Sequence, residues 1–313
     1  MTQNVSRETP DGFLDEYFTR INLKTNQEEL KKRVVEGEGM QVLTELLLAH
    51  EAAIPFENID PLLYAADRVN DPAEFDPVKI DPRSVFEKLV RNKRGGFCHE
   101  HALLTRMVLE ELGFHTRQVL ARVLIHGKPG VGPLSHQASI VRVDDREVLV
   151  DNGFGAGTPP VPLALDRLGE THHTAQGEFR LMAAADVLDE SRLADHEIVV
   201  QRRSRGEFDS MYGFSLREVF DIDLQMSNWW AATRPGGPFT SQLAVVHALP
   251  EGGRVSLTNT TLARQAGGER EETQLTSAED LGRILRDEFG IAVDAGRLEV
   301  LWQKAEGFAA AAK

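Results

Sequence analysis

The chain of 313 residues contains a single cysteine, Cys98, in a setting that suits chemistry. It follows a Gly-Gly pair in the stretch RGGFC and precedes a run with helical periodicity. A thiol is nucleophilic as the thiolate, and the N-terminal end of a helix lowers a thiol pKa. Two adjacent glycines let backbone and substrate approach closely, because neither carries a Cβ atom. Cys98 is therefore the candidate nucleophile, and a small buried hydrophobe is the alternative interpretation.

A cysteine nucleophile needs a histidine to accept its proton and a third group to hold the imidazole in one tautomer. His99 and His101 share the helix expected after Cys98. Residues one or two apart on a helix do not face each other, so we expect neither ring to reach the thiol. His136 opens an expected strand after the loop GKPGVGPLS, and Asp151 ends the strand EVLV. We expect His136 to be the base and Asp151 to orient it, with a solvated histidine and a turn aspartate as the alternative.

The elements expected to position these residues begin with helices. Apolar side chains recur at helical spacing through the first third of the chain, and Asp81, Pro82 and Gly113 fit helix-cap positions. The expected helices are residues 13–21, 43–47, 82–90 and 98–112. Short runs rich in β-branched residues then alternate with Gly, Pro and Asp clusters, which is typical of strands. These strands are residues 115–126, 136–143, 146–154, 177–183, 196–203 and 206–214.

The last stretch mixes both element types. A helical segment with two tryptophans covers residues 222–233. Another helix, with Thr276 or Ser277 as its N-cap, ends near residue 290. Between them we expect strands within residues 241–249, 253–263 and 271–275. The final EGFAAAAK is expected to be a frayed tail.

Composition narrows the functional classes. The net charge of −14 disfavours non-specific nucleic-acid binding, because a polyanion would be repelled. No run approaches about 18 apolar residues, and the N-terminus lacks the basic start and apolar core of a secretory signal. One cysteine excludes an internal disulfide and fits a reducing compartment, so we expect a soluble cytoplasmic protein. The length of the chain suggests about two or three domains. The histidines at 99–101 and 172–173 match no zinc-ligand spacing, and we expect no metal.

Several motifs in one order along the chain resemble the arylamine N-acetyltransferase family. RGGFCHE (94–100) is similar to the family's Arg-Gly-Gly-x-Cys-x-Glu signature, and IPFENID (54–60) is similar to its upstream Pro-Phe-Glu-Asn segment. SHQASIV supplies the family histidine, and LVDNGFG supplies the aspartate followed by Gly-Phe-Gly. The spacing of Cys98, His136 and Asp151 also agrees with the family's catalytic triad. RPGGPFTSQLAV resembles the start of the family's third domain.

The resemblance implies an α+β fold of three domains with a cysteine-protease or transglutaminase-like core. A helical bundle carrying the cysteine would span residues 1–112, a β-barrel carrying the histidine and aspartate residues 113–222, and an α/β lid residues 223–313. The implied reaction is ping-pong. It moves an acetyl or other short acyl group from acetyl-CoA (acyl-CoA), the co-substrate, through acyl-Cys98 to an arylamine, hydrazine or arylhydroxylamine. The protein would be a monomer or homodimer without nucleic-acid or membrane partners.

The same resemblance assigns further roles. Arg94 and Glu100 are expected to form a structural ion pair or hydrogen-bond hub, and the backbone N–H of Cys98 is the candidate oxyanion donor. Core packing is the alternative for the phenylalanines of the proposed substrate site. The expected substrate contacts are Phe97, Gly153, Phe154 and Phe239.

The sequence departs from the family pattern at two places, and it is compatible with other functions. His101 stands where the family often has a small amide, which would alter packing behind the nucleophile. ATRPGGPF stands where a Ser/Thr-rich segment is expected, which puts substrate contacts there in doubt. An amide synthase of the same family, which closes a macrolactam, and a papain- or transglutaminase-like hydrolase would use the same triad. A catalytically silent binding protein is the alternative from another class.

Overall fold

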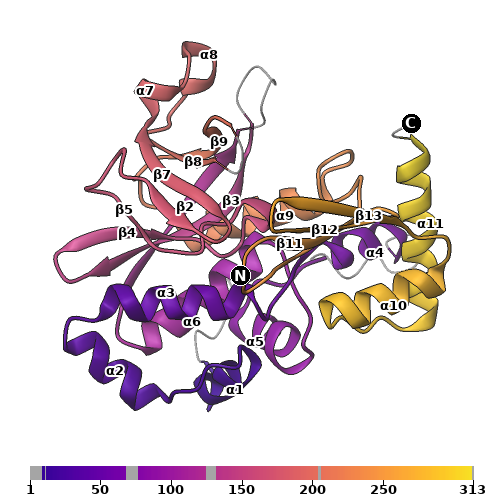
Figure 1. Ribbon diagram of the computed structural model, residues 1–313, viewed down its shortest axis with the longest axis horizontal. Coiled ribbons are helices and arrows are strands. Elements are labelled where there is room, and N and C mark those ends of the chain that lie inside the picture. The colour runs from indigo at the N-terminus through magenta and orange to yellow at the C-terminus, as the bar shows by residue number, and fades with distance from the viewer. Residues whose placement is uncertain (1–8, 11, 68–76, 125–131, 204–205, 312–313) are drawn as a thin grey trace.

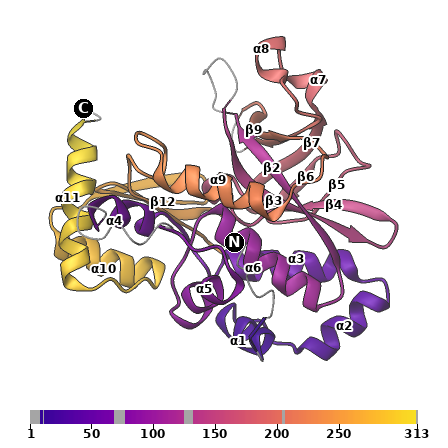
Figure 2. The same cartoon turned by 180° about the vertical axis from the view of Figure 1, so that it is seen from behind.

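The structure of the protein is a computed structural model that describes residues 9–10, 12–67, 77–124, 132–203 and 206–311. The described elements form an α+β fold with three parts: a group of helices, an eight-stranded sheet, and a five-stranded sheet with C-terminal helices (Figure 1). The eight-stranded sheet and the C-terminal helices lie at opposite ends of the molecule (Figures 1 and 2). This architecture confirms the expected fold class.

Local caps explain where the helices of the first part begin and end. The side chain of Asp81 accepts a hydrogen bond from the backbone N–H of Ser84 at 2.9 Å, and Gly113 has a left-handed φ of 93° after the last helix. Apart from the helix at Ile59–Asp67, the helices of this part share one buried core that includes Phe13, Phe86 and Leu104. The described helices are α1 (Phe13–Arg20), α2 (Gln27–Val35), α3 (Gly39–Glu51), α4 (Ile59–Asp67), α5 (Pro82–Phe86), which continues as the π-helix η1 (Glu87–Arg91), and α6 (Cys98–Glu111).

The second part is an antiparallel sheet with the strand order β5-β4-β3-β2-β9-β8-β7-β6. It curls so that side chains from both of its halves, including Val119, Ile140, Phe179 and Val200, bury one another in a single core. This produces a barrel-like shape. Its strands are β2 (His115–Val123), β3 (Leu134–Val143), β4 (Arg146–Val150), β5 (Leu163–Ala164), β6 (His172–Thr174), β7 (Gly177–Ala183), β8 (Ile198–Arg203) and β9 (Asp209–Phe214). Short helices η2 (Gly155–Gly157), α7 (Ala184–Val187) and α8 (Glu190–Leu193) interrupt them.

The third part is a five-stranded antiparallel sheet that includes a strand from the first third of the chain. Strand β1 (Phe56–Glu57) pairs with strand β10 (Ala244–Ala248), and helix α4 packs its buried Ile59 and Leu62 into the core of this sheet. The strand order is β1-β10-β11-β12-β13. The other elements are β11 (Arg254–Thr258), β12 (Thr261–Ala266), β13 (Glu269–Gln274), α10 (Ala278–Phe289) and α11 (Ala295–Ala311).

Two helices complete the arrangement. Helix α9 (Asp221–Thr233) packs against strand β3 and helix α4, and so links the second part to the third (Figure 2).

The expectation of a frayed C-terminal tail is wrong. Helix α11 continues to Ala311, because Phe308 packs against the core of the five-stranded sheet. Within the described residues, no helix has both the length and the apolar character that crossing a membrane requires.

Candidate active site

Cys98 is the first residue of helix α6 and is buried, with 2% of its surface exposed. Its backbone N–H has no acceptor within the helix, because the first residues of a helix lack a preceding turn. The carboxylate of Glu100 caps the same end by accepting a hydrogen bond from the Phe97 backbone N–H at 3.1 Å. The thiol therefore lies at the positive end of the helix dipole, which favours the thiolate.

The two glycines before Cys98 are required by the protein's own packing. A Cβ atom at Gly95 would lie 2.0 Å from the carbonyl oxygen of Pro55, and one at Gly96 would lie 2.7 Å from Oε2 of Glu100. The segment that carries Pro55 can therefore run directly against the loop before the nucleophile. This contact adds a structural reason for the glycines, beyond the close substrate approach expected from the sequence.

His136 and Asp151 meet at the barrel side of the thiol. His136, on strand β3, has its Nε2 atom 2.7 Å from Oδ2 of Asp151, the residue that follows strand β4. The Tyr212 hydroxyl also donates to Oδ2 at 2.7 Å, and the Gly153 backbone N–H donates to Oδ1 at 2.8 Å. Since Asp151 occupies Nε2, the other ring nitrogen of His136 serves the hydrogen-bonding interaction with Cys98.

These contacts decide the charge state of the thiol. Burial raises the pKa of Cys98, but the neighbouring His99 and His136 rings outweigh it and lower the pKa to about 6. Burial lowers the pKa of His136, and the carboxylate of Asp151 reverses that effect and raises it to about 10. The pKa of Asp151 is lowered by His136, Tyr212 and the Gly153 N–H against the effect of burial. Near neutral pH the arrangement favours a thiolate next to an imidazolium.

The expectation that His99 would not reach the thiol is wrong. Its Nδ1 atom lies 3.3 Å from Sγ of Cys98, and its Nε2 atom lies 2.9 Å from Oγ of Ser227 on helix α9. Side chains tilt toward the N-terminus of a helix, and no preceding turn separates them in the first turn, so neighbouring residues can converge there. His101 does turn away from the thiol: its Nδ1 atom lies 2.8 Å from Nε2 of His50, and its Nε2 atom lies 3.1 Å from the Gly96 carbonyl oxygen.

The four expected substrate contacts lie around this centre. The Phe97 ring packs 5.0 Å from the Phe239 ring, and the Phe154 and His136 rings form a T-shaped pair with 5.0 Å between centroids. A Cβ atom at Gly153 would lie 2.8 Å from the Cα atom of Cys98, so only a glycine lets this loop pass the nucleophile. Phe97 is fully buried, whereas Phe154 and Phe239 are partly exposed.

A cluster of buried charges holds the start of helix α6. Arg94 does not pair with Glu100; it pairs with Glu57 at 2.6 Å and with Asp60 at 3.1 Å. Glu100 pairs instead with Lys88 at 2.7 Å. No local spacing in the sequence indicates that Lys88 and Asp60 belong to this cluster. The hub role expected for Arg94 and Glu100 is confirmed, and a direct ion pair between them is not formed.

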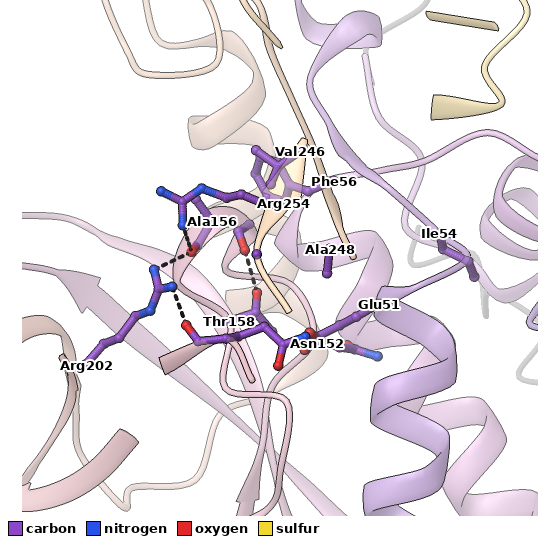
Figure 3. Close-up of a pocket in the computed structure, with 13 residues that line it drawn as sticks. Glu51, Ile54, Phe56, Asn152, Ala156, Thr158, Arg202, Val246, Ala248 and Arg254 are labelled. Atoms are coloured by element: carbon purple, nitrogen blue, oxygen red, sulfur yellow. Dashed lines mark hydrogen bonds between the residues drawn. The ribbon is translucent and has the colours of Figure 1, made fainter. Parts of the chain in front are cut away.

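A separate pocket lies where the three parts meet, lined by Glu51, Asn152 and Val246 among others (Figure 3). The guanidinium groups of Arg202 and Arg254 converge on the Ala156 carbonyl oxygen, at 2.6 and 3.5 Å. Glu51, at the end of helix α3, also lines the pocket, and its buried Oε1 atom has no hydrogen-bond partner among the residues that the structure describes. Across the part of the chain that the structure describes, no group of three or more His, Cys, Asp or Glu residues is placed to hold a metal ion.

Comparison with known proteins agrees with this geometry. A family model described as N-acetyltransferase matches residues 39–298. The chain is 32% identical over 284 residues to an arylamine N-acetyltransferase of Escherichia coli (strain K12), covering 90% of this chain and 89% of that protein. The solved arylamine N-acetyltransferase of Salmonella typhimurium superposes with a TM-score of 0.79 at 29% identity, covering 95% of this chain and 99% of that one.

A second solved relative has CoA bound. The Mycobacterium marinum arylamine N-acetyltransferase in complex with CoA superposes with a TM-score of 0.76 at 30% identity, covering 93% of this chain and 99% of that one. The family model and the relatives extend over nearly the whole chain, including the segments that carry Cys98, His136 and Asp151. The chain therefore belongs to the arylamine N-acetyltransferase family of enzymes.

Proposed function

We propose that the protein transfers an acetyl or other short acyl group from acyl-coenzyme A to an arylamine, hydrazine or arylhydroxylamine through an acyl-Cys98 intermediate. The observation that carries this proposal is the buried Cys98 thiol at a helix N-terminus, next to a His136 ring that Asp151 holds at 2.7 Å. Membership of the arylamine N-acetyltransferase family supports the same acceptor class. The coenzyme A complex of the Mycobacterium marinum relative supports the donor class.

The geometry supports a two-step reaction in which the resting pair is regenerated. The Cys98 thiolate forms a bond to the acyl carbon, the bond from that carbon to the donor sulfur breaks, and the proton of the His136 imidazolium passes to the leaving sulfur. The amine nitrogen then attacks the Cys98 thioester and gives one proton to His136, and Sγ leaves as the thiolate. The backbone N–H of Cys98 is the proposed donor to the oxyanion in both steps.

Asp151 has a fixed role in this scheme. It accepts hydrogen bonds from Tyr212 and from the Gly153 backbone as well as facing His136, so its carboxylate cannot rotate without losing them. A carboxylate held in this way fixes the orientation and tautomer of the imidazole that it faces. The Nδ1 atom of His136 is thus kept available to the thiol in both steps.

Mass spectrometry of the protein after incubation with a donor tests the proposal. Acetyl-CoA and propionyl-CoA are expected to leave one acyl group on the peptide that contains Cys98, and added arylamine is expected to remove it as the N-acylated amine. Malonyl-CoA belongs in the same series, because one relative at 23% identity is named an N-malonyltransferase.

The matched control is Cys98→Ala, which removes the nucleophile. It is expected to form no adduct and to lose about 1 kcal/mol of stability, the cost of a small buried cavity. Loss of the acyl group to water, at a rate that the arylamine does not change, would contradict amine transfer and would favour a hydrolase.

A further inference from the structure

His99 occupies a position that joins the nucleophile to helix α9. Its ring is fully buried between Cys98 and Ser227, with Nδ1 3.3 Å from Sγ and Nε2 2.9 Å from the Ser227 hydroxyl. Ser227 in turn donates its hydroxyl proton to the Leu134 carbonyl oxygen at 2.7 Å. The thiol thus has an imidazole on each side: His136 from strand β3, and His99 from its own helix.

The Ser227 contact decides which nitrogen of His99 carries the proton. A hydroxyl has one proton, and a carbonyl oxygen can only accept, so the proton of Ser227 lies toward Leu134. The Ser227 oxygen must then accept from Nε2 of His99. Neutral His99 is therefore the Nε2–H tautomer, and the lone pair of its Nδ1 atom faces the sulfur of Cys98.

We propose that His99 is a second catalytic imidazole, which accepts the Cys98 proton at Nδ1 and shares the activation of the nucleophile with His136. The S–H bond of Cys98 breaks, the proton binds Nδ1 of His99, and the electron pair stays on sulfur as the thiolate. The imidazolium keeps its Nε2–H bond to Ser227, so the transfer needs no rearrangement. This inference rests on the proposed role of Cys98 as the acyl-accepting nucleophile.

The charges around His99 suit this role. From the barrel, the groups that face the thiol are the uncharged Ser135 carbonyl oxygen, 3.6 Å from Sγ, then His136 and, behind it, Asp151. Helix α9 contacts the His99 ring through the uncharged Ser227. The His99 and Phe97 rings form a T-shaped pair with 5.5 Å between centroids. Among the described residues His99 has no carboxylate partner, so the thiolate is the anion that would balance a charged ring. A positive charge on His99 also lowers the pKa of Cys98.

The family signature does not specify the residue at position 99. The signature leaves the residue between the cysteine and the glutamate open, and RGGFCHE places a histidine there. The role of His99 is therefore a property of this chain and of its contact with Ser227. It predicts that the thiol keeps part of its reactivity when His136 is replaced.

Alkylation of Cys98 by iodoacetamide, measured from pH 5 to pH 9, tests this prediction without any acyl donor. His99→Gln retains a group that can reach Ser227 and removes the imidazole from the thiol. It is expected to slow alkylation at pH 6 by about twofold to fivefold, the change in thiolate fraction when a pKa of about 6 rises by about half a unit to one unit. His136→Gln is expected to retain part of the low-pH rate. The double variant is expected to behave as an ordinary thiol with a pKa near about 8.5.

Two further variants separate chemistry from packing. Ser227→Ala leaves the His99 ring in place but frees its tautomer, and it is expected to slow alkylation at pH 6 by less than His99→Gln does. His101→Asn removes another buried imidazole of the same helix, which contacts His50 and Gly96 instead of the thiol. It is expected to lower the thermal unfolding temperature without moving the alkylation profile.

Different results would contradict the role of His99 and the proposed acyl transfer. An alkylation profile that His99→Gln and Ser227→Ala leave unchanged, in folded protein, overturns the role of His99 even if acyl-Cys98 forms. An identical loss of rate in His136→Gln and in the double variant overturns it as well. Absence of acyl-Cys98 in the wild-type protein would overturn the acyl-transfer function, while the alkylation rates would still report the imidazoles that act on the thiol.

Discussion

At the scale of single residues, the chemistry depends on how buried groups offset the cost of burial. Cys98, His136 and Asp151 are each nearly inaccessible to solvent, and burial alone would favour their neutral forms. The carboxylate of Asp151 accepts three hydrogen bonds, which keep it ionised, and its charge then holds the proton on His136. The imidazolium in turn favours the thiolate of Cys98. The reactive state is therefore a property of the coupled group.

This coupling predicts the pH dependence of acyl transfer. The rate is expected to rise as Cys98 ionises with a pKa of about 6 and to fall as His136 loses its proton with a pKa of about 10. Asp151→Asn removes the charge that raises the His136 pKa, so the fall of the rate at high pH should begin at a lower pH. We expect kcat/KM to fall on the order of 10³-fold to 10⁴-fold, the scale set by a misplaced tautomer in a serine triad.

A pH profile of kcat/KM for the wild-type protein and the variant measures this effect. Asp145→Asn, in the turn after strand β3, is the control, because that carboxylate is fully exposed. If kcat/KM of Asp151→Asn falls at the same high pH as that of the wild type, another group holds the proton on His136.

At the scale of elements, the position of Cys98 depends on how helix α6 begins. Lys88, on the π-helical turn η1, lies 2.7 Å from both Glu100 and Asp60, and its side chain is only 16% exposed. Removing one partner of a buried ion pair leaves an uncompensated charge, which costs about 3–5 kcal/mol. The Glu100 carboxylate that Lys88 neutralises is the same group that caps the helix at Phe97.

Lys88→Met is therefore expected to lower the free energy of unfolding by about 3–5 kcal/mol, as measured by urea denaturation. Arg91→Met is the matched control. It lies on the same turn and pairs with Glu16 and Glu87 at the surface, where such pairs contribute about 0–1 kcal/mol. Adding Glu100→Gln to Lys88→Met should recover part of the loss, since the amide can still accept from Phe97. Equal effects of the two single variants would contradict a specific role of the buried cluster.

At the scale of the whole molecule, three parts of the chain converge behind the site. Asn58 connects the first to the third: its amide donates to the carbonyl oxygens of Phe239 and Gln242, and its side-chain oxygen accepts from the Ala244 backbone. Glu51 lines the pocket where the three parts meet, and within the described chain one of its carboxylate oxygens has no hydrogen-bond partner. Burial, and secondarily the charge of Asp151, raise the pKa of Glu51 well above its ordinary range.

A carboxyl group whose pKa is raised on folding stabilises the protein less as pH increases. Below the unfolded pKa, Glu51 is protonated in both states; above it, the unfolded state ionises while the folded state resists. Glu51→Gln removes this penalty. The variant should gain stability relative to the wild type by about 1.4 kcal/mol for each pH unit between the two pKa values.

Thermal unfolding at pH 4, 6 and 8 measures the difference, which should be smallest at pH 4. Glu45→Gln, on the same helix, is the control with the opposite sign, because Arg33 lowers the pKa of Glu45. A Glu51→Gln variant that is less stable than the wild type by the same amount at every pH would show that the carboxyl group is paired in the native protein.

The sequence by itself determined the local elements and pointed to three residues for the chemistry. Asp81 caps a helix, Gly113 ends one, and the β-branched runs form strands, because these features depend on interactions within a few residues. The order of motifs along the chain was enough to name the family. It also named Cys98, His136 and Asp151, which the structure brings together: Asp151 lies 2.7 Å from His136, and His136 lowers the pKa of Cys98.

Only the tertiary structure decided the contacts between distant segments. Strand β1 and helix α4 lie early in the chain but pack with the C-terminal sheet, and no periodicity in residues 56–67 indicates that partner. Lys88 meets its acidic partners, and His99 meets Ser227, across loops whose path the local sequence does not specify. Hydrophobic periodicity indicates that one face of a helix or strand is buried. The packing of the three parts against each other determines which charged or titratable group lies opposite that face.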